Sequence, residues 1–226
     1  MKYPYLLLDA DNTLFDFDAG NRIAVSAVCR AFDIPDTDEN FSIYEGCNLA
    51  MWEAFERGEV TKEFLVVQRF RDFFAKLGIQ RDAEACNRLH LATLEQNTLL
   101  LPHALEVCRT LSKTHKLYIV TNAVASVQKS RLSHSAIAPF ITGAFISEEI
   151  GANKPTPAYF DYVFSHVDGL RKDNCLVVGD SLTSDILGAM NYGLPCCWFN
   201  PLHLPLPRSM KTTYEIDDLT QLYNIV

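Results

Sequence analysis

The stretch from Tyr5 to Asp18, YLLLDADNTLFDFD, holds a short apolar run that stops at two aspartates. The run, Leu6–Leu8, has the length and flanks of a fully buried strand. Asp9 and Asp11 follow it, although aspartate is a poor strand former. In an open α/β sheet, the last residues of a buried strand lie at the carboxyl-end crevice where such folds bind ligands. The stretch therefore predicts two carboxylates at a ligand-binding edge, although a simple Asx-turn would give the same local pattern.

Composition limits the classes of protein to which the chain can belong. Its 226 residues, 48% of them hydrophobic, suffice for one large domain or for a core domain with a smaller insert. The formal net charge of −8 argues against nucleic acid or an anionic membrane as a partner, because no basic surplus is present to neutralise phosphates. Seven cysteines without a CxxC pair indicate reduced, buried thiols. We expect a soluble, cytoplasmic protein with no signal peptide or membrane span, either a monomer or a homodimer.

Strand and helix patterns alternate along most of the chain. The predicted strands cover residues 6–8, 117–120, 144–147, 176–178 and 196–199, and helical patterns begin at Pro102, Ala125, Pro157 and Ser184. Strands that alternate with helices of this length form βαβ units. The fold class predicted is therefore α/β, with a Rossmann-like, doubly wound parallel sheet.

Residues 16–94 break this alternation, because they show helical patterns and no convincing strand. The patterns cover residues 21–32, 49–55, 61–77 and 82–97, with Thr61 as a helix N-cap and Gly78 as a terminator. We therefore predict an α/β core domain made of residues 1–15 and 95–226, and an inserted all-helical cap domain made of residues 16–94. The aromatic residues of the insert, Phe55, Phe64, Phe70, Phe73 and Phe74, are expected to be buried.

Several polar side chains follow the predicted strands and should meet at one edge of the sheet. They are Asp9, Asp11, Thr121, Asn122, Asp180 and Asp185, together with Lys154 in the loop after the strand 144–147. Carboxylates at such a density repel one another unless cations are present. Lys154 supplies one positive charge, and the remaining deficit predicts a divalent metal. Ligands that are all oxygen favour Mg²⁺, which usually shares its coordination shell with a substrate phosphate.

This set of residues suits phosphoryl transfer. A carboxylate such as Asp9 can attack phosphorus and form an aspartyl-phosphate. Asp11 points the same way from an extended segment, and it could protonate the leaving oxygen and then deprotonate water. Thr121 and Asn122 can donate hydrogen bonds to phosphate oxygens.

The sequences DADNT, TNA, NKP and GDSLTSD resemble, in this order, the four motifs of the haloacid dehalogenase superfamily. The resemblance covers essentially the whole chain. It implies that Asp9 is the nucleophile and Asp11 the general acid and base, and that Thr121 and Lys154 bind the phosphoryl group. It also implies that Mg²⁺ lies on Asp9, the backbone carbonyl of Asp11 and Asp180, with Asp185 close behind. The helical insert after the first motif resembles the C1 type of cap.

Asp11 also separates the dehalogenases from the phosphatases of this superfamily, because a halide leaving group needs no proton. DADNTLFDFD and GANKPTPAYFDYV more narrowly resemble the cytosolic pyrimidine 5′-nucleotidases. The resemblance implies a Mg²⁺-dependent phosphomonoesterase acting on nucleoside 5′-monophosphates, and so a small phosphorylated metabolite as its partner. Two alternatives stay open: a sugar-phosphate phosphatase or phosphomutase on the same scaffold, and an inactive homologue that acts as a binding protein.

Candidates for substrate specificity lie at the start of the insert and within it, and each has a structural alternative. They are Phe15, Phe17, Asn21, Arg22, Trp52 and Phe55. The first two could stack on a base or pack at the hinge. Asn21 and Arg22 open a predicted helix, whose N-terminus favours anions. Trp52 and Phe55 have helical spacing, which is more often a core feature than a ligand-binding one.

Overall fold

The structure is a computed structural model that describes residues 2–226, and the chain divides into two compact units. The first contains residues up to Phe17 together with Thr98–Val226, and the second contains Asp18–Asn97. No helix among the described residues combines the length and the apolar character that a bilayer crossing requires.

The first unit is built on a parallel sheet. Its strands are β1 (Tyr5–Leu8), β2 (Lys116–Thr121), β3 (Gly143–Ile146), β4 (Cys175–Gly179), β5 (Cys196–Phe199) and β6 (Tyr214–Ile216). They lie in the order β3-β2-β1-β4-β5-β6, and every pair is parallel. The central strand β1 pairs Leu8 with Ile119 of β2 and with Val178 of β4. This register brings the carboxyl ends of these three strands to one edge, and the predicted α/β fold class is confirmed.

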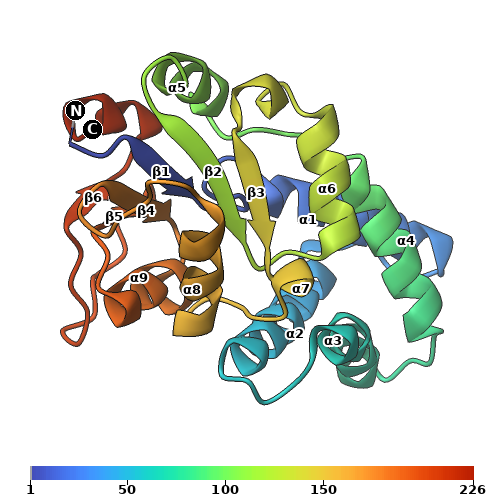
Figure 1. The fold of residues 1–226 in the computed structure, drawn as a ribbon. Coiled ribbons are helices and arrows are strands. Elements are labelled where there is room, and N and C mark those ends of the chain that lie inside the picture. Colours follow the sequence, from blue (N-terminus) through green and yellow to red (C-terminus); the bar gives the residue numbers. More distant parts are fainter. Residues whose placement is uncertain (1) are drawn as a thin grey trace. The chain divides into compact units, whose positions relative to one another are not determined.

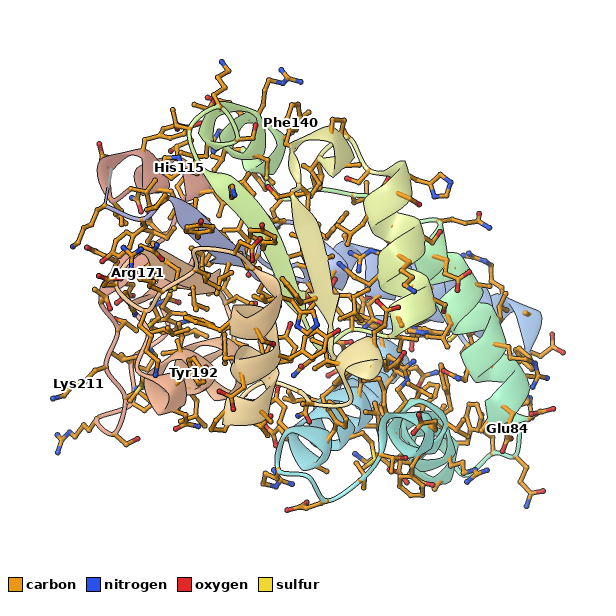
Figure 2. The ribbon with its side chains drawn as sticks, viewed as in Figure 1. Glu84, His115, Phe140, Arg171, Tyr192 and Lys211 are labelled. Atoms are coloured by element: carbon orange, nitrogen blue, oxygen red, sulfur yellow. The ribbon has the colours of Figure 1, made fainter. Side chains whose placement is uncertain are left out.

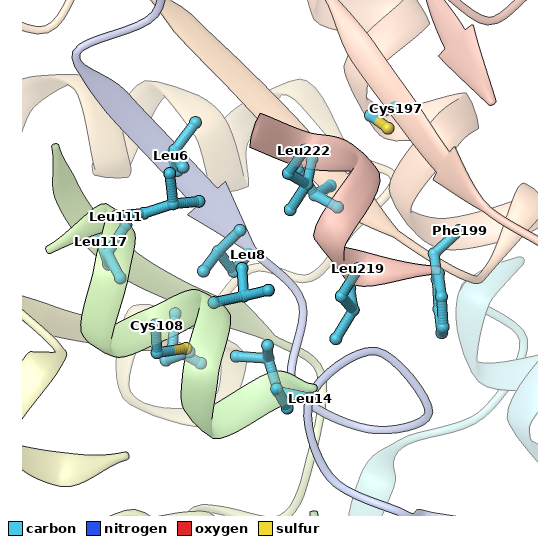
Figure 3. Close-up of a cluster of buried hydrophobic side chains, with 14 of the residues drawn as sticks. Leu6, Leu8, Leu14, Cys108, Leu111, Leu117, Cys197, Phe199, Leu219 and Leu222 are labelled. Atoms are coloured by element: carbon cyan, nitrogen blue, oxygen red, sulfur yellow. The ribbon is translucent and has the colours of Figure 1, made fainter. Parts of the chain in front are cut away.

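Helices cover both faces of this sheet (Figure 1). They are α5 (Ala104–Leu111), α6 (Ala125–His134), α7 (Ser147–Ile150), α8 (Pro157–His166) and α9 (Leu187–Tyr192), with the short helices η1 (Ala138–Phe140) and η3 (Leu219–Asn224) and the π-helical turn η2 (Leu182–Ile186). Side chains of a strand alternate between faces. Leu6 and Leu8 therefore pack with α5 and η3, as Figure 3 shows, whereas Leu7 packs with α8 and α9.

Aromatic contacts reinforce the helical layers. On one side Phe160 of α8 stacks on Tyr192 of α9, with ring centroids 5.5 Å apart. On the other, the guanidinium of Arg109 lies 5.7 Å from the ring centroid of Phe140. Figure 2 labels Tyr192 and Phe140, which lie in these two separate layers. The layers bury the sheet on both faces, so its strands are continuous apolar runs.

The second unit consists of helices. They are α1 (Phe17–Ala31), which begins at the last residue of the first unit, α2 (Asp38–Glu56), α3 (Lys62–Leu77) and α4 (Ala83–Glu95). As expected, the Thr61 hydroxyl accepts a hydrogen bond from the amide of Phe64, and Gly78 ends α3 with a φ of 66°. The buried core of this unit includes Phe70, Phe73 and Phe74. Phe64 is 46% exposed, so the expectation that it is buried was wrong.

Two further elements differ from the sequence-based expectation. Helix α2 begins at Asp38, eleven residues before the predicted start at Leu49, because Thr37 caps it and its interior tolerates Gly46. A glycine at that position lowers helix propensity and hides the pattern. Strand β6 was not predicted, since its three residues are too short to show a period.

A buried polar network crosses the core of the helical unit. Arg69 of α3 donates to Asn48, to Asn87 and to the carbonyl of Val66, at 2.9, 3.2 and 3.1 Å. Its guanidinium also lies 3.2 Å from Nδ1 of His90, whose Nε2 lies 2.8 Å from Oδ1 of Asn21. Burial, and to a lesser extent the Arg69 charge, hold the pKa of His90 well below its ordinary value of 6.5. His90 is therefore neutral at neutral pH.

This arrangement predicts acid sensitivity of the helical unit. Below pH 6.5 the unfolded chain protonates His90 while the native chain does not. The free energy of unfolding therefore decreases as the pH is lowered. Between pH 6.5 and 5.0 the loss due to this residue is at most about 2 kcal/mol. Urea unfolding at several pH values measures this loss of stability. A Trp198→Phe background leaves Trp52, in the helical unit, as the fluorescent tryptophan that reports the unfolding. His90→Gln should flatten the pH dependence and exposed His134→Gln should leave it unchanged; equal profiles for all three proteins would contradict the prediction.

Candidate active site

Lys154 lies at the centre of a buried group of charges at the carboxyl edge of the sheet. Its side chain is 1% exposed, and Nζ lies 2.6 Å from Oδ1 of Asp9 and 2.5 Å from Oδ1 of Asp185. Nζ also donates to the carbonyl of Val120 at 2.7 Å. These three oxygens satisfy the donors of the ammonium group, which explains how a charge can stay buried there.

The end of β4 supplies the other acidic side chains. Asp180 accepts a hydrogen bond from the Thr13 hydroxyl at 3.2 Å, and its own amide donates to the same hydroxyl oxygen at 3.1 Å. The second oxygen of Asp185 accepts from the amide of Ser181 at 3.1 Å. A Cβ on Gly179 would lie 2.2 Å from this oxygen, so only glycine lets the Asp185 carboxylate pack against the strand end. The turn η2 carries Asp185 back over the strand that precedes it.

The acidic side chains crowd one another, and their pKa values reflect this. Burial raises the pKa of Asp9 well above its ordinary value, and Asp185 raises it further, while Lys154 opposes the shift. Burial, with Asp185, also raises the pKa of Asp180 to about 7. For Lys154, burial lowers the pKa, but Asp185 and Asp9 outweigh it, so the group stays protonated. One ammonium therefore does not neutralise the site.

Three of the carboxylates are arranged as a metal site would require. Asp9, Asp180 and Asp185 each offer one oxygen, and these oxygens all lie within 4.8 Å of one another. The donors are all carboxylate oxygens, which suits a hard divalent cation such as Mg²⁺ better than zinc. A cation there would also relieve the repulsion that raises the pKa values of Asp9 and Asp180. The residues present therefore fit a divalent metal.

Thr121 and Asn122 lie at the end of β2, beside this group. The buried Thr121 accepts a hydrogen bond on its hydroxyl oxygen from the amide of Ala123 at 3.1 Å. The Asn122 side chain accepts from the Lys154 amide at 3.0 Å and donates to the Lys154 carbonyl at 2.9 Å. In the structure the amide group of Asn122 fixes the backbone of the lysine loop, and its predicted role in binding phosphate stays a prediction.

Asp11 lies near the acidic group but has a different partner. The side chain of Asp11 is 25% exposed, and its Oδ1 lies 2.5 Å from Nη1 of Arg131, which is only 2% exposed. The metal-site group contains Asp9, Asp180 and Asp185 and not the Asp11 carboxylate. Arg131 and Thr13 were both missed from the sequence. Thr13 could have been noticed within DADNT, but a single arginine on a helix gives no signal.

The candidate specificity residues divide between the two units. Phe15 is fully buried in the core of the first unit, and Phe17 is half-buried. In the helical unit, Asn21 is buried and donates to Glu45 at 2.6 Å, and Arg22 pairs with Asp36 at 2.6 Å. Half-buried Trp52 and Phe55 lie edge to face, with centroids 5.8 Å apart. The structure thus gives Phe15, Asn21 and Arg22 packing or pairing partners of their own.

Comparisons with known proteins show the family of this chain. Residues 3–193 match the family model of the haloacid dehalogenase-like hydrolases. The HAD-hydrolase YfnB of Bacillus subtilis is 35% identical over 225 residues, covering 100% of this chain and 96% of the relative. Its crystal structure, described as bound to magnesium, has a TM-score of 0.95 and covers 100% of this chain and 99% of that one.

Two further relatives carry the names of nucleotidases. The pyrimidine 5′-nucleotidase PynA of Streptococcus pneumoniae is 31% identical and covers 96% of this chain and 92% of the relative. The pyrimidine 5′-nucleotidase YjjG of Escherichia coli is 28% identical and covers 100% of this chain and 99% of the relative.

The fold and the acidic site define a hydrolase with a doubly wound α/β core and an inserted helical unit. The chain belongs to the haloacid dehalogenase-like hydrolases, and the family resemblance seen in the motifs is confirmed.

The central ion pairs predict the effect of removing the lysine. Lys154→Met leaves Asp9 and Asp185 buried without their cation, and such a loss typically costs about 3–5 kcal/mol. Urea unfolding in EDTA at pH 7.5 measures it. Lys129→Met provides the control, since Lys129 pairs with Glu149 on the exposed surface and its loss should cost less than about 1 kcal/mol. Equal stabilities of the two variants would show that Lys154 does not offset the buried charges of Asp9 and Asp185.

Proposed function

We propose that this chain is a Mg²⁺-dependent phosphomonoesterase that works through an aspartyl-phosphate on Asp9. Nucleoside 5′-monophosphates with a pyrimidine base are the proposed substrates. The observation that carries the proposal is the position of Asp9, in contact with Lys154 and beside two further carboxylates. The names of the nucleotidase relatives support the substrate class.

The reaction proceeds in two steps in this proposal. In the first, a carboxylate oxygen of Asp9 attacks phosphorus, the bond to the leaving oxygen breaks, and Asp11 gives its proton to that oxygen. In the second, Asp11 takes a proton from water, whose oxygen attacks phosphorus. The bond between phosphorus and Asp9 breaks, and inorganic phosphate leaves. Lys154 offsets negative charge on Asp9 and on the transferring group.

Asp9, Asp180 and the backbone carbonyl of Asp11 would hold the metal, with Asp185 behind them. Bound Mg²⁺ supplies positive charge that stabilises the phosphoryl oxygens. Thr121 is proposed to donate to the phosphate, while Asn122 acts by holding the Lys154 backbone. The helical unit, residues 18–97, is proposed to act as the cap that selects the substrate, with Trp52 and Phe55 as the candidates that offer aromatic surface. Seven free, buried thiols are compatible with work in the cytoplasm.

A phosphate-release assay over a panel of esters tests the proposal. The panel contains UMP, dUMP and dTMP, purine nucleotides, hexose phosphates and N-acylneuraminate 9-phosphate, each with and without Mg²⁺. We expect Mg²⁺-dependent release that is fastest with the pyrimidine nucleotides. Asp9→Asn should reduce release to background without lowering the melting temperature, whereas Asp173→Asn, on the exposed surface, should have no effect. Phosphate release by the Asp9→Asn variant at the normal rate would show that Asp9 is not the nucleophile. Faster release from a sugar phosphate than from the pyrimidine nucleotides would show that the proposed substrate class is wrong.

The hydrogen bond from Thr13 to Asp180 predicts a role in metal affinity. Thr13→Val keeps the shape of the side chain but removes the donor that orients the carboxylate. Loss of such a partner typically weakens metal binding about 10- to 100-fold. Titration of activity against Mg²⁺ concentration should show this shift, with the maximal rate largely recovered at saturation. An unchanged half-saturating concentration would contradict the role given to Thr13.

A further inference from the structure

Arg131 contacts two residues of the loop that follows β1. It lies in α6, and its Nη1 is 2.5 Å from Oδ1 of Asp11. The guanidinium carbon lies 4.3 Å from the ring centroid of Phe15, which is fully buried. A planar guanidinium that stacks on a ring and bonds a carboxylate in its own plane has little freedom to turn. Arg131 therefore meets the Asp11 side chain from a fixed direction.

The loop itself is held tightly. The amide of Phe15 donates to the carbonyl of Ala10 at 2.8 Å, and the amide of Asn12 donates to the carbonyl of Phe15 at 2.9 Å. Asn12 adopts a φ of 56°, a left-handed conformation that asparagine tolerates better than most residues. These bonds fix the backbone of Asp11 and the base of the Phe15 ring. The torsions of the Asp11 side chain then remain the main freedom of this carboxylate, and Arg131 restricts them.

Stability alone does not account for this pair. Removing a guanidinium from water is costly, and the carboxylate it meets is still 25% exposed, which weakens their attraction. An apolar side chain of similar volume would fill the space beside Phe15 at no such cost. The ion pair engages Oδ1 of Asp11.

We propose that Arg131 is a positioning residue that holds the carboxylate of Asp11 in the orientation needed to exchange a proton with the leaving oxygen. The inference rests on the proposed function, because it requires a phosphate ester whose leaving oxygen takes up a proton. In the first step, the bond from phosphorus to the leaving oxygen breaks as the proton passes from Asp11 to that oxygen. Arg131 itself neither gives nor takes a proton, and it acts through Asp11.

Two substrates with different leaving groups distinguish this role from a structural one. An alkyl ester, the best of the panel above, releases an alkoxide that needs a proton, whereas p-nitrophenyl phosphate releases an anion that is stable without one. We expect Arg131→Gln to lower kcat/KM for the alkyl ester about 10- to 100-fold, and for p-nitrophenyl phosphate less than about threefold. The value of kcat/KM reports the steps up to cleavage of the ester bond, so it isolates the proton donation.

Arg109→Gln is the matched control, because Arg109 also lies over a phenylalanine ring but on the exposed surface. It should leave both substrates unaffected. Arg131→Lys, which keeps the charge, should recover part of the lost rate. In an Asp11→Asn background, Arg131→Gln should cause no further loss on the alkyl ester, because the residue through which it acts has already been removed.

The possible results separate the inference from the proposed function. Equal losses on both substrates, with a lower melting temperature, would show a merely structural residue and overturn the inference while leaving the phosphatase assignment intact. An additional loss in the Asp11→Asn background would also overturn it, because Arg131 would then act independently. If the wild-type protein hydrolyses neither substrate with Mg²⁺, the proposed function fails and the inference fails with it.

Discussion

The contact of one ammonium group with two buried carboxylates is the constraint on which the rest of the site depends. Lys154 lies within 2.6 Å of both Asp9 and Asp185, although these residues are 145 and 31 positions away in sequence. A buried ion pair is seldom worth more to stability than well-packed apolar side chains. The arrangement is therefore better explained by chemistry than by folding. The contact also depends on two further residues. Gly179 leaves room for the Asp185 carboxylate, and the side chain of Asn122 fixes the backbone of Lys154.

The sequence predicted the sheet and the gathering of the acidic residues well, for a physical reason. Parallel strands buried on both faces are apolar runs with abrupt ends, and their carboxyl ends must share an edge. The same reasoning fails for Arg131, because its role depends on a side chain that reaches from α6 to a loop 120 residues away. It also does not find the bonds of Asn122 to the Lys154 backbone, whereas the predicted contact of Asn122 with phosphate stays a prediction. The first half of α2 was missed because Gly46 interrupts the helical pattern. The helix nevertheless begins after its cap at Thr37.

Asp9 and Asp11 are two residues apart, yet the fold gives them different surroundings. Asp9 is buried beside Lys154 and two other carboxylates, whereas Asp11 is partly exposed and paired with Arg131. Two carboxylates that perform different tasks need environments that differ in this way. The left-handed turn at Asn12 and the bond from Phe15 to Ala10 close a tight loop after Asp11, and Thr13 within this loop bonds Asp180. A short loop thus separates a candidate nucleophile from a candidate proton carrier.

The residues proposed for chemistry all belong to the first unit, while most candidates for substrate choice belong to the second. Each unit has a core of its own, and the helical unit adds a buried polar network around Arg69 whose described partners are uncharged. An uncharged set of partners makes this network depend on hydrogen-bond geometry rather than on charge, so it fixes how α2, α3 and α4 pack. The contacts of Lys154 with Asp9 and Asp185 lie within the first unit, so substitutions on the surface of these helices should leave them in place. If the helical unit selects the substrate, as proposed, such a division would let one phosphoryl-transfer site serve different phosphate esters.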